Sequence, residues 1–273
     1  MGHAKKKYAL AVIVPVANDI RILDCLESLR EAKEDNIEVI LVLSNVKNNL
    51  IKKIIKYKTK LNIQIIKDSS YNIGKLRNIG IKKSKANIFY FVDVDCKIYP
   101  EALQRAIKNG QKNLVTIGKV HFVGKSWISS LDARLREARY DSSKKFAYCP
   151  NLVVKKELFE RVGFFDESYN YGSDGEFSYR ILHEGIIPEY DSSMKLEHDG
   201  TKAFFSIFRT WIKYGQGRYK RLKKASFQER LKGLFSPNLF DYREKFSYNL
   251  ICGLCLIGRW IGWLKESIRG ESA

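Results

Sequence analysis

The sequence predicts an α/β fold in which a mostly parallel central sheet is flanked by helices. Short apolar segments alternate with longer amphipathic ones through the first hundred residues, which is the order of a chain that alternates strands with helices. The short segments are apolar at nearly every position, as is typical of strands buried on both faces of a parallel sheet. A chain of 273 residues that is 45% hydrophobic is large enough to bury such a core.

The individual elements follow from this pattern, with strands at the continuous apolar runs and helices where apolar residues recur every three or four positions. In the first hundred residues the predicted strands are 8–14, 39–43, 63–66 and the run that begins at Asn87, and the predicted helices are 20–33 and 47–60. Residues 72–84 are predicted as a loop that leads into a helix. Later in the chain the predicted helices are 100–110, 126–141 and 176–184, the strands are 114–123 and 151–154, and the loops include 96–100 and 197–200.

The chain is strongly basic, with 49 Lys and Arg against 30 Asp and Glu and a net charge of +19. This excess favours anionic partners, namely nucleic acid, anionic lipid or phosphorylated small molecules. The five cysteines are too few and too irregularly spaced for a disulfide framework. Cys252 and Cys255 have metal or redox spacing, but no second pair completes a zinc site. We therefore expect reduced thiols in a cytosolic protein.

Two carboxylates, Asp93 and Asp95, end the run that begins at Asn87. Like charges this close repel each other unless a cation lies between them. Mg²⁺ and Mn²⁺ prefer oxygen ligands, and Mg²⁺ is commonly shared between carboxylates and substrate phosphates. The pair therefore predicts a divalent-cation site that holds a diphosphate, and the alternative is a solvated turn.

Other polar or turn-forming residues follow the neighbouring strands. Pro15 ends the first predicted strand, and Ser44 and Asn45 end the second. Ligands of a parallel α/β sheet bind beyond the carboxyl ends of its strands. We therefore expect these residues and the two aspartates along one edge of the sheet.

Several motifs, taken in order, resemble those of the family 2 glycosyltransferases, which have the Rossmann-like GT-A fold. The resemblance covers roughly residues 8–217. The motifs are Val12-Ile13-Val14-Pro15-Val16-Ala17-Asn18, Asn72-x-Gly74-x-x-Arg77-Asn78-x-Gly80-Ile81, Asp93-Val94-Asp95, Asn151-Leu152-Val153-Val154, Gly163-Phe164-Phe165-Asp166-Glu167, Gly172-Ser173-Asp174-Gly175-Glu176-Phe177 with Arg180, His198, and the segment from Arg209 to Gly217. Together they imply an enzyme that uses a nucleotide sugar and a Mg²⁺ or Mn²⁺ cofactor.

The resemblance also implies a role for each motif. Asp95 would be the direct metal ligand, Asp93 would reach the ribose or a metal-bound water, and His198 would complete the metal shell, although a surface loop is the alternative for His198. The residues implied to contact substrate are Pro15, Val16, Asn18, Ser44, Asn45, Gly74, Lys75, Arg77, Asn78, Asp93, Val94, Asn151 and Glu176. Many relatives end the second strand in an acidic pair that reads the nucleobase. Because Ser44 and Asn45 stand there instead, uracil, guanine and thymine all stay open.

Asp174 is the predicted catalytic base. An inverting transfer needs a carboxylate that removes the proton of the acceptor hydroxyl as it attacks the anomeric carbon. Gly172 and Gly175 on either side allow the backbone to approach a substrate closely. Asp174 is alternatively the N-cap of the following helix, and Glu176 competes for the role of base. Ser173 occupies a position where relatives often carry an acid.

The C-terminal quarter has a different character. From residue 202 onward the sequence has 15 Lys and Arg against 5 Asp and Glu, and 250–264 is apolar except for Arg259. No apolar run reaches the roughly 20 residues of a spanning helix. Cations and aromatics beside an apolar segment indicate a helix in the interface of an anionic membrane, and packing on the protein or across a dimer is the alternative. The predicted domains are a GT-A catalytic domain at 1–200, with a nucleotide-sugar half at about 8–100 and an acceptor half at about 101–200, and a basic helical extension at 201–273.

The combined prediction is a metal-dependent, inverting glycosyltransferase. It would move a sugar from a nucleoside diphosphate sugar to a hydroxyl of a glycan or lipid-linked acceptor in cell-envelope polysaccharide or glycolipid synthesis. We expect it on the cytoplasmic face of the cell membrane, held to anionic lipid through 202–264, without nucleic acid and compatible with a homo-oligomer. The alternatives are a sugar-phosphate nucleotidyltransferase, although its usual Gly-rich loop is missing, and a non-enzymatic basic protein that binds nucleic acid or membrane.

Overall fold

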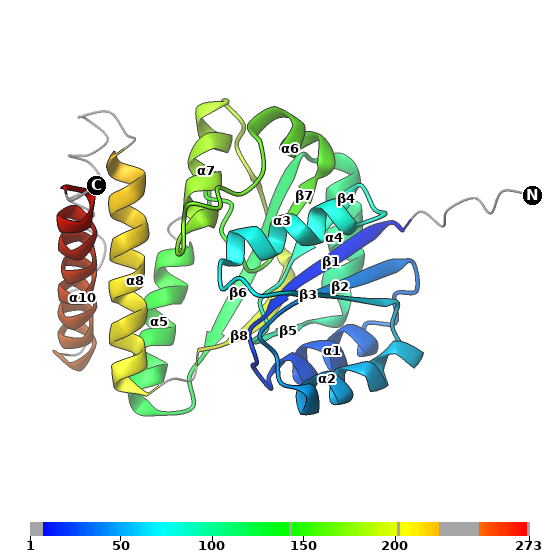
Figure 1. The fold of residues 1–273 in the computed structure, drawn as a ribbon, viewed down its shortest axis with the longest axis horizontal. Helices are drawn as coiled ribbons and strands as arrows, with labels where there is room; N and C mark the ends of the chain where they lie inside the picture. The colour runs from blue at the N-terminus through cyan, green and yellow to red at the C-terminus, as the bar shows by residue number, and fades with distance from the viewer. Residues whose placement is uncertain (1–7, 142–143, 201–202, 224–245, 272–273) are drawn as a thin grey trace, which may run out of the picture. The chain divides into compact units, whose positions relative to one another are not determined.

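The computed structural model describes residues 8–141, 144–200, 203–223 and 246–271. Its elements, in chain order (Figure 1), are β1 (Leu10–Val16), α1 (Ile22–Glu31), β2 (Ile37–Ser44), α2 (Asn48–Ile55), the short 3-10 helix η1 (Lys56–Thr59), β3 (Ile63–Asp68), α3 (Ile73–Lys83), β4 (Ile88–Phe91), β5 (Cys96–Ile98), α4 (Pro100–Lys112), β6 (Val115–Val123), α5 (Trp127–Asp141), β7 (Leu152–Lys155), α6 (Lys156–Val162), α7 (Ser173–His183), β8 (Glu189–Asp199), α8 (Phe204–Lys223) and α10 (Phe246–Glu271).

The chain divides into two compact units. Unit 1 comprises Met1–His121, Lys144–Glu167 and Asp174–His198. Unit 2 comprises Phe122–Ser143, Ser168–Ser173 and Asp199–Ala273. Besides the C-terminal region that the sequence analysis separated, unit 2 therefore also includes α5 and the segment before α7.

The strands of the described residues form one sheet in the order β3-β2-β1-β4-β7-β6-β8-β5 (Figure 1). The pairs among β3, β2, β1 and β4 are parallel. β7 pairs antiparallel with both β4 and β6, and β5 pairs antiparallel with β8. The predicted α/β fold with a central sheet flanked by helices is confirmed, and its parallel part comes from the region in which strands and helices alternate.

Helices cover both faces of the parallel part, which explains its continuous apolar runs. β2 is buried at every position. On one face α3 packs against β1 and β2, and Gly80 makes this close approach possible, because an added Cβ there would lie 2.6 Å from Cγ2 of Ile13. On the other face α4 packs against β4 and β7, and α1 contacts α4 and α2. Residues that alternate along β1 therefore meet apolar neighbours on both sides.

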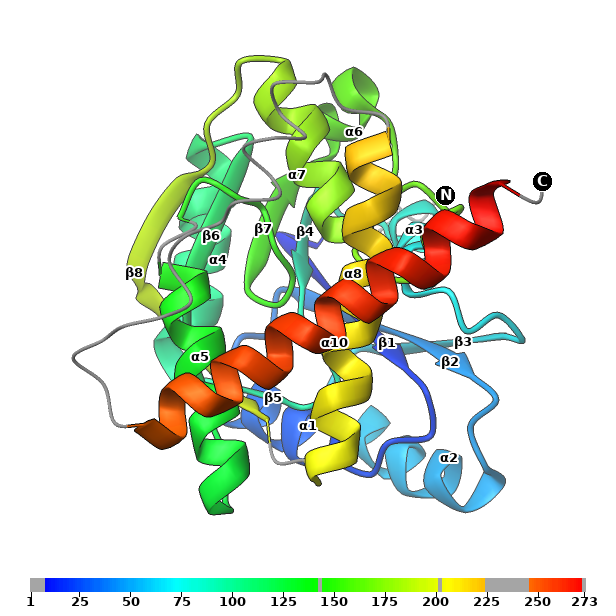
Figure 2. The same cartoon turned by 90° about the vertical axis from the view of Figure 1, so that its left-hand side faces the viewer.

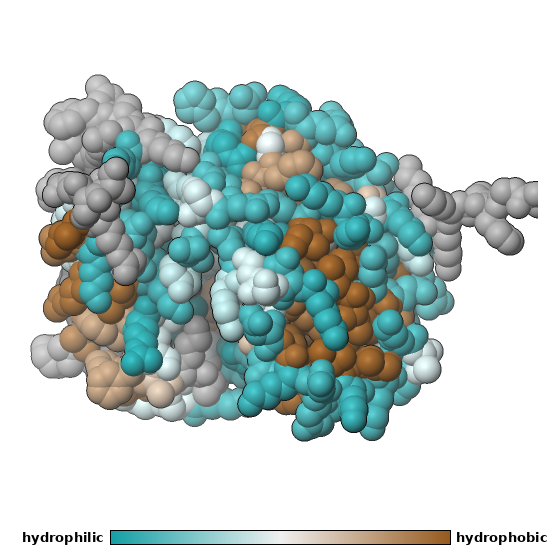
Figure 3. All heavy atoms as spheres, in the orientation of Figure 1, coloured by the Kyte–Doolittle hydropathy of each residue, from teal (hydrophilic) through white to brown (hydrophobic). Residues whose placement is uncertain are grey.

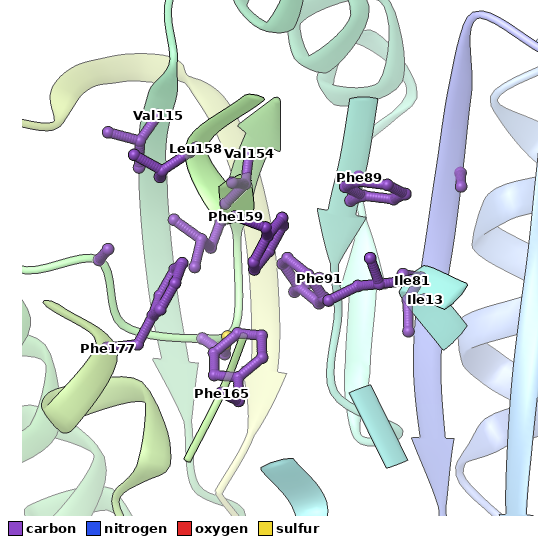
Figure 4. Packing of buried hydrophobic residues seen from close by; sticks show 14 of the residues in the cluster. Ile13, Ile81, Phe89, Phe91, Val115, Val154, Leu158, Phe159, Phe165 and Phe177 are labelled. Carbon is purple, nitrogen blue, oxygen red and sulfur yellow. The ribbon is translucent and has the colours of Figure 1, made fainter. Parts of the chain in front are cut away.

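An aromatic cluster in unit 1 joins the end of β4 to the start of α7. The ring centroids of Phe91 and Phe165 are 5.3 Å apart, and those of Phe165 and Phe177 are 4.6 Å apart. Phe159 of α6 stacks on Phe177 at 5.3 Å, and Figure 4 shows the four rings close together. Aromatic pairs at such distances contribute about 0.5–1.5 kcal/mol each beyond their burial. The cluster thus fixes α7 relative to the strand that precedes Asp93.

The strand β3 forms one edge of the sheet and is only half-buried along most of its length. Figure 3 shows hydrophobic residues gathered on unit 1 over the region where Figure 1 places β1, β2 and β3. The carboxyl end of β3 carries Lys67 and Asp68. Charged side chains on an edge strand oppose pairing with another chain.

Two segments predicted as loops are strands. Residues 96–100 contain β5, and residues 197–199 are the last three of β8. In the antiparallel register Cys96 lies opposite His198, and Ile98 lies opposite Leu196. This pairing joins segments about a hundred residues apart, so local sequence does not reveal it. The burial of Met194, Leu196 and His198 at alternate positions is the period-two signal that identifies β8 as a strand.

Unit 2 is built on α5, α8 and α10, and α10 packs against α8 and also contacts α5 (Figure 2). Trp211 of α8 is fully buried, and its Nε1–H donates to Oδ1 of Asp132 at 2.9 Å. Arg136 donates from Nε to the other oxygen of Asp132 at 2.7 Å. The buried carboxylate of α5 is therefore paired as well as hydrogen-bonded, which offsets the cost of its burial.

The crossing of α8 and α10 depends on glycine. An added Cβ at Gly215 would collide with the backbone of Arg259, and one at Gly262 would collide with the backbone of Ile212. The apolar C-terminal segment therefore forms a helix that packs on protein along its glycine face. Within the described part of the chain, none of the helices combines the length and the hydropathy that a membrane crossing needs. Of the predicted interfacial segment 202–264, residues 202 and 224–245 and the side chains of residues 222 and 246–252 lie outside the described part of the chain.

Candidate active site

The carboxyl ends of β1 and β2 carry the first predicted substrate residues. Pro15 and the buried Val16 end β1. Asn18 follows in the left-handed region at φ 51°, and its Oδ1 accepts a hydrogen bond from the backbone N–H of Lys47 at 3.0 Å. This bond joins the loop after β1 to the loop after β2. Ser44, which ends β2, is buried.

The same edge continues at β3. Asn45 has φ 49°, and its Nδ2 donates to the carbonyl oxygen of Ser69 at 3.0 Å. Ser44 lies opposite Asp68 in the parallel register. A cavity of about 340 Å³ opens beside these residues. It is lined by Leu43, Asn45, Val46, Asn48, Ile51, Lys67, Asp68 and Ser69.

The N-terminus of α3 is capped by Asn72, whose side chain accepts a hydrogen bond from the backbone N–H of Lys75 at 2.9 Å. Asn72 also donates from Nδ2 to the carbonyl oxygen of Glu167 at 2.6 Å. Gly74 is buried in the first turn. The Lys75 ammonium lies 3.6 Å from Oδ2 of Asp68, so this lysine is at the same edge as the strand ends.

Arg77 places a buried cation beneath this edge. Its side chain is 5% exposed, and its Nη2 donates to Oδ1 of Asp93 at 2.9 Å. Burial by itself would lower the pKa of Arg77, but interactions with Cys149 and with the carboxylates of Asp93 and Asp174 raise that pKa above its ordinary value. The guanidinium also lies 5.6 Å from the ring centroid of Phe165. Arg77 therefore pairs with the first aspartate of the metal motif, and its charge also interacts with that of the predicted base.

Val94 is half-buried between the two aspartates. Asp95 has different neighbours from Asp93. Its Oδ1 lies 3.5 Å from Nε2 of His198, and its Oδ2 lies 3.3 Å from Nη1 of Arg21. The side chains of Asp95 and His198 are 11% and 8% exposed. The strand pairing of β5 with β8 thus brings the two predicted metal ligands together.

A donor group for a divalent cation exists at this point. One potential ligand atom each of Asp95, Cys96 and His198 lies within 4.8 Å of the others. A carboxylate and an imidazole together fit Mn²⁺ or Mg²⁺ completed by water and phosphate oxygens. In the described residues Asp93 is outside this group and pairs with Arg77 instead.

Two residues of this centre were missed in the sequence. Arg21 is held by Asp19, with 2.6 Å between Nη2 and Oδ2, as well as by Asp95. In the sequence, the only indication of this role is that Arg21 is a cation directly after the turn that follows β1. Cys96 is buried, and burial raises the pKa of its thiol well above the ordinary value, with Asp95 and Asp93 raising it further. The sequence analysis predicts a loop at Cys96, and a loop gives no reason to expect Cys96 opposite His198 in a strand pair.

Asp174 and Glu176 lie in the first turn of α7 but differ in their surroundings. Asp174 is half-buried, and its Oδ1 accepts a hydrogen bond from the backbone N–H of Gly175 at 2.8 Å. Glu176 is buried, and both of its oxygens bind Arg180, at 2.7 and 2.9 Å. Arg180 also donates to the carbonyl oxygens of residues 162–164. Glu176 therefore holds the turn before α7 in place, and Asp174 is better placed to reach substrate.

Two predicted substrate residues have their side-chain amides engaged within unit 1. Asn151 is fully buried, and its amide contacts Tyr90, Lys119 and Met194 at 2.8–2.9 Å. Asn78 binds the backbone N–H and carbonyl oxygen of Phe165 and one carboxylate oxygen of Glu167. Both amides therefore join segments of unit 1, and their contact with substrate stays a prediction.

Comparison with known proteins finds a matching family and several relatives. The model of the family described as glycosyl transferase family 2 matches residues 11–167. The poly(ribitol-phosphate) beta-N-acetylglucosaminyltransferase TarP of Staphylococcus aureus is 32% identical over 247 residues, which cover 79% of this chain and 73% of TarP. Chondroitin synthase of Pasteurella multocida is 27% identical over 233 residues, which cover 67% of this chain. The chain spans only 24% of that synthase.

The fold is also similar to that of S. aureus TarS. The crystal structure of TarS residues 1–349 in complex with UDP-GlcNAc superposes with a TM-score of 0.59 at 18% sequence identity. The superposition covers 93% of this chain and 81% of that one. At this level of identity the likeness concerns the fold.

We predict that the two aspartates of the metal motif differ in their importance for stability. Asp93→Asn leaves the buried Arg77 without its carboxylate, and we expect it to lower the free energy of unfolding by about 3 kcal/mol, the lower end for a broken buried pair. Asp95→Asn should cost about 1 kcal/mol or less, because Arg21 is partly exposed and keeps Asp19. Urea unfolding followed by circular dichroism measures both, and equal losses would contradict the prediction.

Proposed function

The chain belongs to glycosyltransferase family 2, and from that membership we propose that it transfers a sugar from a nucleoside diphosphate sugar to an acceptor hydroxyl with inversion at the anomeric carbon. The observation that carries this proposal is that Asp95 lies beside His198, and Arg77 pairs with Asp93, directly after the carboxyl end of the parallel strand β4. Because the chain is a family 2 glycosyltransferase, both alternatives from the sequence, a nucleotidyltransferase and a non-enzymatic binding protein, are excluded.

The donor diphosphate would lie along the edge formed by β1, β3 and β4. Arg21, Lys75 and Arg77 place three cations there, each next to a carboxylate. Asp95 and His198 are the residues that would hold Mg²⁺ or Mn²⁺, and the bound cation would stabilise negative charge on the leaving diphosphate. Because Asp93 is turned to Arg77 and is 29% exposed, its second oxygen is left for the ribose.

The nucleobase would enter beside Asn45 and Asp68. The acid that relatives carry at the end of the second strand is missing in this chain, but Asp68 stands at the end of β3, opposite Ser44. The cavity of about 340 Å³ lies beside both residues. UDP is the nucleotide we expect, and the TarS structure with UDP-GlcNAc supports this choice.

Asp174 would act as the base on the acceptor side. Its carboxylate takes the proton of the acceptor hydroxyl while that oxygen forms a bond to the anomeric carbon. The bond from this carbon to the diphosphate oxygen breaks on the opposite face, and the diphosphate leaves with the electron pair. General-base catalysis of this kind contributes about 10²–10⁴-fold to a rate.

The acceptor would be a glycan or lipid-linked saccharide of the cell envelope. The name of TarP, whose acceptor is poly(ribitol phosphate), supports an anionic envelope polymer. The net charge of +19 also favours an anionic acceptor or surface.

We place the enzyme on the cytoplasmic membrane face, attached through α10. One face of this helix packs on α8 through its glycines, and the other exposes Ile257, Trp260, Leu264 and Ile268, each about half exposed or more. These four residues recur at three- and four-residue intervals, so they form one stripe along the helix. An apolar stripe in a basic region is typical of interfacial helices.

The donor site is tested by thermal denaturation with UDP, GDP, TDP and CDP, each with and without Mn²⁺. We expect UDP to raise the melting temperature only when Mn²⁺ is present, since a ligand at 100 times its Kd stabilises the native state by about 2.7 kcal/mol. Asp95→Asn should abolish the Mn²⁺-dependent part of the shift. Absence of a shift with all four nucleotides would overturn the donor assignment.

The base is tested by kinetics with the donor that this screen identifies, following release of the nucleoside diphosphate. We predict that Asp174→Asn lowers kcat by about 10²–10⁴-fold and leaves the KM for the donor nearly unchanged. Glu176→Gln instead weakens the hold on Arg180, so it should lower the melting temperature rather than kcat. The reverse pattern would assign the base to Glu176.

Membrane attachment is tested by flotation with phosphatidylcholine vesicles that contain or lack phosphatidylglycerol. We expect the protein to float with the anionic vesicles and the double variant Ile257→Ser, Leu264→Ser to float less. Each substitution should weaken the free energy of membrane binding by on the order of 1 kcal/mol. Ile187→Ser is the matched control, because Ile187 is 66% exposed but lies in unit 1. Equal flotation of all three proteins would refute attachment through α10. Loss of self-association in the double variant by ultracentrifugation would make the stripe an interface between copies.

A further inference from the structure

The thiol of Cys96 is placed as a third donor at the predicted metal site. Cys96 lies directly opposite His198 in the antiparallel pair of β5 and β8, so the two side chains project from the same face of the sheet. Asp95 is the adjacent residue in the chain. Potential ligand atoms of the three residues lie within 4.8 Å of one another, and Cys96 is 1% exposed.

The chemistry of these donors differs from that of a site made of carboxylates alone. Mg²⁺ and Mn²⁺ favour oxygen ligands, whereas Zn²⁺ and Co²⁺ accept thiolate, imidazole and carboxylate. We propose that this site binds thiophilic divalent cations such as Zn²⁺ through Asp95, Cys96 and His198, whereas Mg²⁺ or Mn²⁺ is held by Asp95 and His198 without the thiol. This proposal rests on the proposed function of Asp95 and His198 as metal ligands.

The neighbouring charges permit such binding. Arg21 lies 3.3 Å from Asp95, but it also binds Asp19 through Nε and Nη2, so it keeps a carboxylate partner if a metal takes its place. Binding of the metal to sulfur releases the thiol proton to the solvent, and the metal charge replaces it. A buried thiolate without a metal would be costly, so the thiol is neutral in the free protein.

Cys25 provides a matched control within the same region. It is buried in α1, and burial raises the pKa of its thiol to about 12, with Asp95 and Asp93 adding to the effect. It is not one of the three close donors. A Cys25→Ser variant therefore changes a second buried thiol near the aspartates without removing a proposed ligand.

The test is titration of the full chain with Co²⁺, followed by near-ultraviolet absorption. A sulfur-to-cobalt charge-transfer band is expected in the wild-type protein and in Cys25→Ser, but not in Cys96→Ser or Cys96→Ala. Competition with a chromophoric chelator should show that the Cys96 variants bind Zn²⁺ at least about 10- to 100-fold more weakly. Removing a residue that only hydrogen-bonds to a metal ligand already costs about this much affinity, so removing a ligand should cost no less. Their binding of Mn²⁺, measured by electron paramagnetic resonance, should be unchanged.

The outcomes separate this proposal from the one it rests on. A wild-type cobalt complex without the sulfur band, in a protein that still binds Mn²⁺, overturns the role of Cys96 and leaves the glycosyltransferase metal site intact. A band that persists in Cys96→Ala and disappears in Cys25→Ser also overturns it. If the protein binds neither Mn²⁺ nor Co²⁺, with or without UDP, the proposed metal site of Asp95 and His198 is itself refuted. The wild-type spectrum decides the first case even if a Cys96 variant does not fold.

Discussion

The buried guanidinium of Arg77 is the interaction on which the rest of the predicted active site depends. A charge that is 5% exposed is costly unless it is paired, and Asp93 pairs it at 2.9 Å. Asp174 also stabilises the positive charge, so one cation lies beside carboxylates from two distant parts of the chain. A backbone arrangement that moved Asp93 away from Arg77 would leave this buried cation without its ion-pair partner, and this constraint keeps α3 and the end of β4 together.

The segment between α6 and α7 is held from two sides. From α3, the amide of Asn78 binds the backbone of Phe165, and Phe165 in turn lies under Arg77. From α7, Arg180 binds Glu176 and the carbonyl oxygens of the turn at residues 162–164. Asn78 and Glu176, which the family resemblance assigns to substrate, therefore also hold this segment in place. Such supporting contacts are what keeps the groups of an active site in a precise position.

In unit 2, the apolar helix α10 packs on protein with one side and exposes apolar residues on the other. Packing on protein and attachment to a membrane were alternatives in the sequence, but one helix has room for both. The glycine face of α10 lies against α8, where Gly262 meets the backbone of Ile212. The opposite face presents Trp260 and Leu264 outward. Packing on protein uses one side of this helix, and the proposed membrane contact would use the other, because an α-helix presents residues three or four apart on one side.

The sequence by itself determined the α/β class, the parallel strands, the edge at which they end and the Asp93–Asp95 motif, because periodicity and apolar runs are local properties. Only the tertiary structure decided which carboxylate meets which cation, that Asp93 pairs with Arg77, and that His198 lies in a strand opposite Cys96. Antiparallel pairing between segments a hundred residues apart is set by the closure of the whole sheet rather than by the residues of either segment. For that reason the edge and its two aspartates could be located from the sequence, but the neighbours of each aspartate could not.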